Sequence, residues 1–193
     1  MEKLPVYEAY ITTVDDGIFT ISLVDEPAVE SNFICFSKET YDFKVEDEEQ
    51  RIVTGVLMRC NYPIIRKGHY IRFPKETIEL MAEKMLADKT HNYINLQHNH
   101  NEYVEDIYLK EVFIKDVEKG INPKGFENIE DGSLFATYKV FNDEVWERIK
   151  KGEFKGFSIE INTHSVVVED VENEMELYSE ILDMLKKIEN KIK

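Results

Sequence analysis

A serine and a cluster of histidines are the residues of this chain whose types and setting could do chemistry. Ser158 lies in the run Lys155-Gly156-Phe157-Ser158-Ile159-Glu160, and His98 ends an apolar run, followed by Asn99 and His100. A serine hydroxyl is a poor nucleophile at neutral pH and needs an imidazole within hydrogen-bond reach to take its proton. Because such pairs are defined in space, their separation along the chain is no obstacle. The hypothesis is acyl transfer, with Ser158 as nucleophile and His98 as general base.

The motif around Ser158 narrows the class of hydrolase. A Gly-x-Ser alone is a weak signal, because most serines near strand starts only bond to local backbone groups. Glu160 stands where the nucleophile elbow Gly-x-Ser-x-Gly has its second glycine, which argues against an α/β-hydrolase.

The histidines also allow a metal site as an alternative. His98-x-His100 followed by Glu105 resembles the first cupin motif, in which two imidazoles and a carboxylate hold a metal on one strand face. The flanking glycines of that motif are missing, and no second histidine motif follows downstream. Metal binding by a β-barrel is therefore the third-ranked hypothesis, and the protease hypothesis needs no metal and no cofactor.

Composition excludes several partners. The 193 residues carry a formal net charge of −15, which repels phosphate backbones, so nucleic acid is not an expected partner. Cys35 and Cys60 lie in apolar runs without metal-ligand spacing, which is typical of buried free thiols in a reducing compartment. The N-terminus has no basic region followed by an apolar one, and no apolar run is long enough to span a membrane. We expect a soluble intracellular protein.

The sequence predicts two strands near the N-terminus and a third directly before the histidine cluster. Residues 6–14 and 17–24 are rich in β-branched and aromatic residues, and Asp15-Asp16-Gly17 between them is a turn signal, so we expect a β-hairpin. Residues 92–97 are expected to form a buried strand that delivers His98 at its end.

Two helices follow from apolar spacing and end signals. The first begins near Pro74 and places an apolar face inward, made of Ile78, Met81, Ala82 and Met85. The second has Asn142 or Asp143 as its N-cap, turns Val145 and Ile149 inward and closes at Gly152.

A strand over residues 107–115 carries the first candidate for a third catalytic residue. Alternation along it places Leu109, Glu111 and Phe113 on one face. A carboxylate among such apolar neighbours is a candidate to orient the base.

The C-terminal segment has a different pattern from the rest. Apolar residues repeat at alternating spacings of three and four, as in an amphipathic helix, at Tyr178, Ile181, Leu185, Ile188 and Ile192. About two heptads are marginal alone, so this helix should pack on its own domain or on a partner, including a second copy of the chain. We therefore expect one domain over residues 1–168 and an acidic amphipathic helix over residues 169–193.

An ordered series of short segments carries a resemblance to a known family. The segments are Ser22-Leu23-Val24-Asp25-Glu26-Pro27-Ala28, Val53-Thr54-Gly55-Val56-Leu57, Phe73-Pro74-Lys75-Glu76, Asn95-Leu96-Gln97-His98 and Gly156-Phe157-Ser158-Ile159-Glu160. In this order they resemble the phage prohead serine proteases of the XkdF type, over roughly residues 6–161.

The resemblance implies a fold and a site. The fold is the α+β architecture of the herpesvirus assemblin protease, a mostly antiparallel β-barrel with flanking helices. Ser158 matches the nucleophile of the family's Gly-x-Ser-Ile motif and His98 matches its histidine, with His100 as the alternative two residues away. The third member can be a histidine or an acidic residue; Glu111 is the first candidate.

Glu160 and His164 are the alternatives to Glu111 as the third catalytic residue.

The resemblance also implies a biological role. The implied role is a maturation protease that acts in the host cytoplasm, inside the immature capsid, on scaffold or on the major capsid protein. The main rival is a non-catalytic capsid-assembly protein that keeps the fold.

Overall fold

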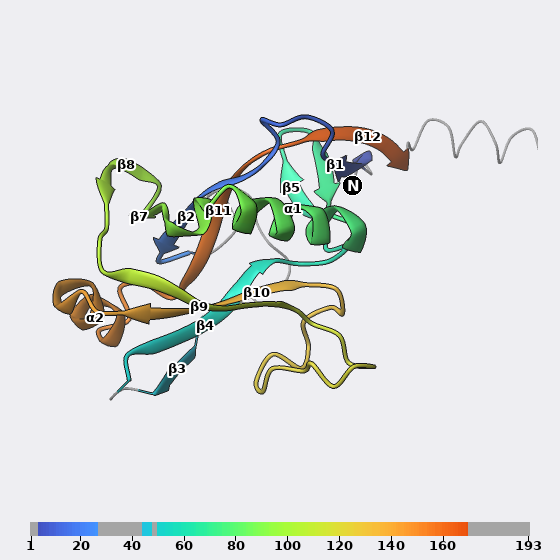
Figure 1. Ribbon diagram of the computed structural model, residues 1–193. Coiled ribbons are helices and arrows are strands. Elements are labelled where there is room, and N and C mark those ends of the chain that lie inside the picture. Colours follow the sequence, from blue (N-terminus) through green and yellow to red (C-terminus); the bar gives the residue numbers. More distant parts are fainter. Residues whose placement is uncertain (1–3, 27–43, 48–49, 170–193) are drawn as a thin grey trace, which may run out of the picture.

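In the computed structural model, the described residues are 4–26, 44–47 and 50–169 (Figure 1). They form an α+β fold with two α-helices, one short 3-10 helix (η1, Thr90–Asn92) and three four-stranded sheets. The expected helix over residues 169–193 and Cys35 lie outside the described residues, apart from Glu169. No described helix has the length and apolar character needed to cross a bilayer.

The first sheet has the strand order β12-β1-β6-β5. Its strands are β1 (Val6–Tyr10), β5 (Ile64–Arg66), β6 (His69–Arg72) and β12 (His164–Glu169). The β1 and β6 strands run parallel, and the other two pairs are antiparallel. The second sheet, of order β3-β4-β10-β9, is antiparallel throughout. Its strands are β3 (Lys44–Asp47), β4 (Ile52–Met58), β9 (Ile107–Ile114) and β10 (Leu134–Val140).

The third sheet has the order β11-β2-β7-β8, in which β2 runs antiparallel to β11 and parallel to β7. Its strands are β2 (Gly17–Val24), β7 (Ile94–Leu96), β8 (Asn99–Tyr103) and β11 (Gly156–Asn162). Only Thr163 separates β11 from β12, so the chain passes directly from this sheet into the first one, as the orange ribbon in Figure 1 shows.

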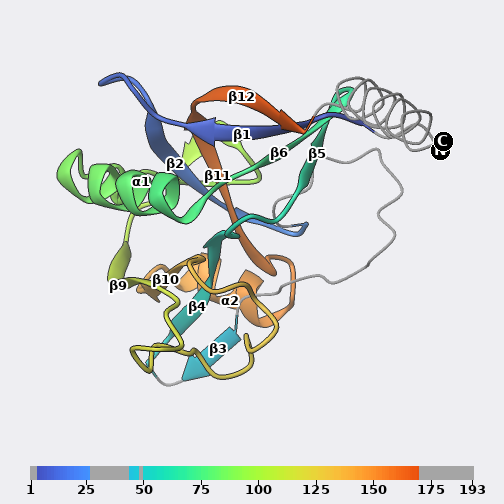
Figure 2. The same ribbon diagram turned by 90° about the vertical axis from the view of Figure 1, so that its right-hand side faces the viewer.

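These sheets correct the expected architecture. We expected a mostly antiparallel β-barrel, whereas the described residues form three sheets, two of them mixed, that do not close into a barrel. The chain changes sheet at short connections, between β1 and β2 and again at Thr163, and these changes leave each sheet with its own edges. Figure 2 shows the strands of the second sheet below those of the first.

The predicted hairpin of residues 6–14 and 17–24 is wrong. The β1 and β2 strands lie in different sheets and do not pair with each other. Between them the Asp16 carboxylate accepts the backbone N–H groups of Thr12 and Thr13, at 2.6 and 2.7 Å. These bonds close a local loop, as short polar side chains do in turns, and β2 leaves it to pair with β11 and β7.

The first predicted helix is confirmed as α1 (Lys75–Ala87), with Pro74 as its N-cap. Proline suits a helix start because the first amides have no intrahelical acceptor. Ile78, Met81 and Met85 are buried, and the helix packs on β2 and β10. Their burial in the main core supports β2, a strand of the third sheet.

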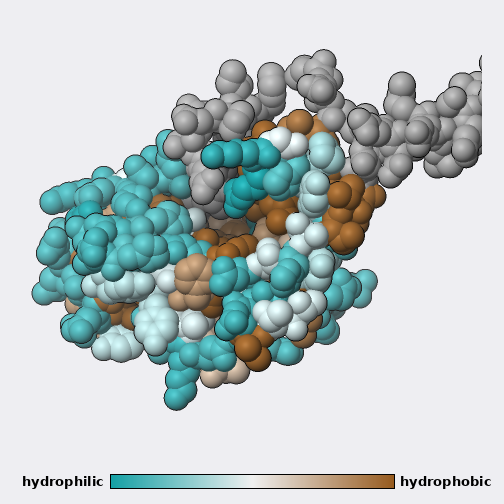
Figure 3. Space-filling model, turned by 90° about the horizontal axis from the view of Figure 1, so that it is seen from above, coloured by the Kyte–Doolittle hydropathy of each residue, from teal (hydrophilic) through white to brown (hydrophobic). Residues whose placement is uncertain are grey.

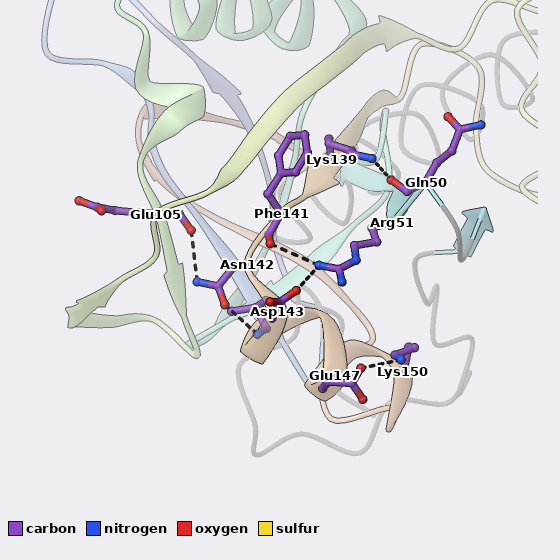
Figure 4. Close-up of polar contacts among 10 residues, drawn as sticks. Gln50, Arg51, Glu105, Lys139, Phe141, Asn142, Asp143, Glu147 and Lys150 are labelled. Carbon is purple, nitrogen blue, oxygen red and sulfur yellow. Dashed lines mark hydrogen bonds and ion pairs between the residues drawn. The ribbon is translucent and has the colours of Figure 1, made fainter.

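The second predicted helix is confirmed as α2 (Asp143–Lys150). The Asn142 side chain accepts the Val145 N–H at 3.0 Å, as expected of an N-cap, and its amide nitrogen donates to the Glu105 carbonyl (Figure 4). Arg51 bridges the Phe141 carbonyl and a carboxylate in the first turn of the helix.

One continuous core joins the helices and sheets. It includes Tyr138 from β10, Trp146 from α2 and Phe157 from β11, together with the buried face of α1. Cys60 is a buried free thiol in this core, as predicted. The surface seen from above in Figure 3 is hydrophilic over much of its described area, in keeping with the high charge of the chain.

Candidate active site

His98 lies in a tight turn that joins β7 to β8. Leu96 pairs with Asn99, so Gln97 and His98 alone form the loop, and both have positive φ, at 51° and 57°. Positive φ at both central residues is the mark of the type I′ hairpin turn, which normally uses asparagine, aspartate or glycine. Residues with side chains pay for this conformation and hold it where function or surrounding contacts require it.

The turn is anchored to β2, the neighbouring parallel strand. The Gln97 N–H donates to the Leu23 carbonyl at 2.9 Å, and His98 Nδ1 lies 3.1 Å from Ser22 Oγ. The predicted buried strand before His98 is confirmed as β7, although it ends at Leu96 and the histidine belongs to the turn after it. The imidazole is thus fixed in place while 42% of its side chain remains exposed.

Alternation along the third sheet separates an apolar face from a polar one. Ile21, Leu23 and Phe157 point into the main core. Ser22 is in register with Asn95 on one side and with Ser158 on the other, so these three residues form a row on the opposite face. Ser22 and Asn95 are fully buried, and Ser158 at the end of the row is partly exposed.

A carboxylate on the same polar face completes the cluster. Glu160 follows Ser158 by two residues on β11, so both side chains lie on one side of the strand. Its Oε1 is 3.2 Å from His98 Nδ1, and its Oε2 is 3.3 Å from His100 Nε2. The Glu160 side chain is only 16% exposed, so its carboxylate is largely shielded from water where it contacts the two imidazoles.

Ser158, the predicted nucleophile, is brought to this cluster but is not bonded to the base. It lies directly opposite Ser22, the hydroxyl that does reach His98, and directly opposite residues have Cβ atoms about 4.5 to 5.5 Å apart. No hydrogen bond joins Ser158 to His98 in the part of the chain that the structure describes. Catalytic hydrogen bonds are often long before substrate binds.

Glu111, the first candidate for the third residue, is not brought to His98. It lies on β9 in the second sheet, with 55% of its side chain exposed and its carboxylate 3.2 Å from Lys110 Nζ. The expectation that it shares a face with Leu109 fails because β9 has a bulge: Thr137 pairs with Glu111, but Tyr138 pairs with Leu109. Of the three candidates, Glu160 is the one in contact with the base.

His164, the other alternative, lies apart from the cluster. It is on β12, stacked on Tyr10, with Nε2 3.5 Å from Asp16 Oδ1. The Thr12 and Thr13 N–H groups, and to a lesser extent His164, hold the pKa of Asp16 below its usual value. This pair ties β12 to the loop between β1 and β2.

Metal chemistry finds no support in the described residues. His98, His100 and Glu160 meet, but no group of three or more histidine, cysteine or acidic residues among the described ranges is arranged to hold a metal ion. Glu105, the expected third ligand of the cupin-like hypothesis, belongs to no such group within those ranges.

Two members of the cluster were not foreseen as site residues. Ser22 and Asn95 appeared in the sequence only as parts of recognised segments, and neither has a motif that marks it as functional. The available signal was alternation: both are polar residues between apolar neighbours in strands, and therefore face away from the core.

A known protein family matches the part of the chain that carries His98, Ser158 and Glu160. Residues 41–167 match the family described as "Putative phage serine protease XkdF". The chain belongs to this family. The matched range includes His98, Ser158 and Glu160, whereas Ser22 precedes it.

A curated protein from a bacterium is also similar to the chain. The uncharacterized protein YqbD of Bacillus subtilis (strain 168) is 29% identical over 158 residues, covering 76% of this chain and 44% of the relative. The chain therefore spans less than half the length of that relative. No solved structure matches the chain.

Proposed function

We propose that this member of the XkdF family is a serine endopeptidase that uses Ser158 as nucleophile, His98 as general base and Glu160 as the carboxylate that orients the base. The observation that carries the proposal is the position of Glu160, which contacts His98 Nδ1 on the sheet face that also holds Ser158. A carboxylate must accept a hydrogen bond, so it favours a proton on Nδ1 and leaves Nε2 free to act as base.

The proposed chemistry follows the general acyl-transfer scheme. Ser158 Oγ attacks the scissile carbonyl while its proton passes to His98 Nε2. The imidazolium then gives that proton to the leaving amine, and the peptide's acyl half stays on Ser158 as an ester. Water activated by the same nitrogen hydrolyses the ester and restores the hydroxyl. Glu160 stabilises the imidazolium formed in each half of the cycle.

Burial supports Ser158 over Ser22 as the nucleophile. Ser22 is fully buried and its hydroxyl donates to Asn95 Oδ1 at 2.6 Å, so a peptide carbonyl has no approach to it. Ser158 is partly exposed on the adjacent strand. We propose that His98 Nε2 meets Ser158 Oγ when the substrate binds, since catalytic hydrogen bonds often tighten only in the complex.

The proposed biological role is maturation of a phage prohead. The substrates would be the scaffold and the N-terminal part of the major capsid protein, cleaved inside the immature particle in the host cytoplasm. The net charge of −15 is compatible with an internal assembly component that avoids packaged nucleic acid. The amphipathic pattern between Tyr178 and Ile192 would supply a tether to scaffold or to a second copy of the chain.

Mass spectrometry of co-expressed scaffold and capsid proteins tests the proposal. Defined fragments are expected with the wild-type chain and should vanish with Ser158→Ala and with His98→Ala. Ser165→Ala, which removes an exposed hydroxyl from β12, is the matched control and should leave the fragments unchanged. Fragments that persist in Ser158→Ala, or that never form, would favour the non-catalytic assembly protein.

A further inference from the structure

A buried hydroxyl and amide form a polar pair under the candidate active site. Ser22 Oγ donates to Asn95 Oδ1 at 2.6 Å, and both residues are fully buried. Apolar side chains at these positions would avoid the cost of removing two polar groups from water. The same Ser22 oxygen lies 3.1 Å from His98 Nδ1, which gives the pair a connection to the general base.

The direction of each hydrogen bond can be worked out from the carboxylate. Glu160 Oε1 can only accept, so the proton between it and His98 must be on Nδ1. Ser22 Oγ contacts the same Nδ1 and must therefore accept as well. A serine hydroxyl has a single proton, and Ser22 directs it to Asn95 Oδ1.

This chain of donors accounts for an otherwise unexplained atom. Among the buried side-chain nitrogen and oxygen atoms of the described residues, Asn95 Nδ2 alone lacks a hydrogen-bond partner. Turning the amide over would give Nδ2 a partner in Ser22 Oγ. The Ser22 proton would then point at His98 Nδ1, which already carries one. The unpaired Nδ2 donor costs free energy and by itself favours the turned amide, but the two facing protons oppose that orientation and keep Oδ1 toward Ser22.

We propose that Ser22 and Asn95 are positioning residues that hold His98 with its proton on Nδ1 and Nε2 free. Ser22 Oγ is a second hydrogen-bond acceptor for Nδ1 beside Glu160, on the buried side of the imidazole. Asn95 acts through Ser22, because its Oδ1 accepts the Ser22 proton. The catalytic consequence rests on the proposed function, because it matters only if Nε2 takes the Ser158 proton; the tautomer itself does not depend on it. This gives a role to Ser22 and Asn95, which the proposed triad leaves without one.

The tautomer can be measured directly by NMR of the full chain labelled with ¹⁵N-histidine, with His98 assigned from the signal lost in His98→Gln. In the wild type, Nδ1 should resonate as a protonated nitrogen and Nε2 as an unprotonated one. Ser22→Ala should move the tautomer ratio roughly five-fold toward the Nε2–H form, the effect of losing one hydrogen bond. Ser22→Thr, which keeps the hydroxyl, should restore the wild-type ratio.

A second variant distinguishes the effect of the Ser22–Asn95 hydrogen bond on the His98 tautomer from an effect of packing. Asn95→Leu leaves the Ser22 hydroxyl in place but without its acceptor, so its proton can turn toward His98 Nδ1 and should shift the tautomer in the same direction as Ser22→Ala. Thr54→Val is the matched control, because it removes a buried hydroxyl that bonds Thr137 Oγ1 at 2.9 Å in another sheet. It should leave the His98 signals unchanged.

The outcomes distinguish this inference from the proposed function. Cleavage that depends on Ser158, combined with an unchanged tautomer in folded Ser22→Ala and Asn95→Leu, would overturn the inference and leave the protease proposal standing. A shifted tautomer without Ser158-dependent cleavage would support the inference and count against the proposed function. With cleavage present, kcat should fall in Ser22→Ala several-fold at unchanged KM, and Ser22→Thr should recover it.

Discussion

Ser158 and Ser22 lie directly opposite each other on β11 and β2, but of the two hydroxyls only that of Ser22 is hydrogen-bonded to His98. In this conformation the fully buried Ser22 is hydrogen-bonded to the imidazole, and Ser158 is partly exposed to solvent. Because Ser22 contacts Nδ1 of the ring and we propose that Ser158 gives its proton to Nε2, the two serines should differ sharply in their mutational effects. Ser158 should be essential for cleavage, and Ser22 should only modulate it.

Glu160 should matter for catalysis far more than Glu111. Glu160→Gln keeps the size of the side chain but presents an amide that can stabilise the wrong tautomer, so kcat should fall on the order of 10²- to 10⁴-fold. Glu111→Gln is the matched control, since Glu111 lies in another sheet beside Lys110, and its kcat should stay within about two-fold of the wild type, well inside the effect of one hydrogen bond. Steady-state cleavage of a substrate peptide measures both. Equal losses in the two variants would contradict the assignment of Glu160.

Asp16 should make the free energy of unfolding decrease at acidic pH. The Thr12 and Thr13 N–H groups favour its charged form and lower its pKa, so the folded state is stabilised above the ordinary aspartate value of about 4, and this contribution is lost as the pH falls through the lowered pKa. Asp16→Asn should lower the free energy of unfolding at pH 7 and flatten its decline below about pH 4.

Urea unfolding at pH 7, 4 and 3 measures that difference. Asp15→Asn, which changes the exposed neighbouring carboxylate, is the control and should follow the wild-type curve. If Asp16→Asn kept the full acid dependence of the wild type, the loop contacts of Asp16 would not be its source.

Gly132 should be intolerant of a side chain for two separable reasons. Its φ is +85°, and a Cβ added there would lie 2.9 Å from Cys60 Sγ in the core. Gly152 has a similar φ of +72° but open space around it. Gly152→Ala should therefore cost only the left-handed backbone penalty of about 1 kcal/mol, and Gly132→Ala about 1 to 3 kcal/mol more for overpacking. Denaturant unfolding of both variants would show it, and equal costs would mean that Cys60 yields at no cost.

The sequence predicted the elements whose signals are local. The start of α1 at Pro74, the Asn142 cap of α2 and the buried strand before His98 each depend on a few adjacent residues. The position of Ser158 on a strand was likewise predicted, because alternation in Phe157, Ser158 and Ile159 is visible in the chain itself.

The parts that could not be predicted depend on pairing between distant strands. No local pattern in residues 6–24 indicates that β1 and β2 belong to different sheets, because the turn residues around Asp16 are as typical of a loop as of a hairpin. The bulge that moves Glu111 away from Leu109 arises only in register with β10. The turn at Gln97 and His98 could not be predicted either, because neither residue is one that turns with positive φ usually contain.

Labelling with a fluorophosphonate probe that modifies activated serines, followed by peptide mapping, tests whether Ser158 is the nucleophile. One adduct, on Ser158, is expected in the wild-type chain. The adduct should be absent from His98→Ala and retained, with slower formation, in Ser22→Ala. An adduct on Ser22, or a Ser158 that stays unmodified under conditions where scaffold is cleaved, would show that Ser158 is not the nucleophile.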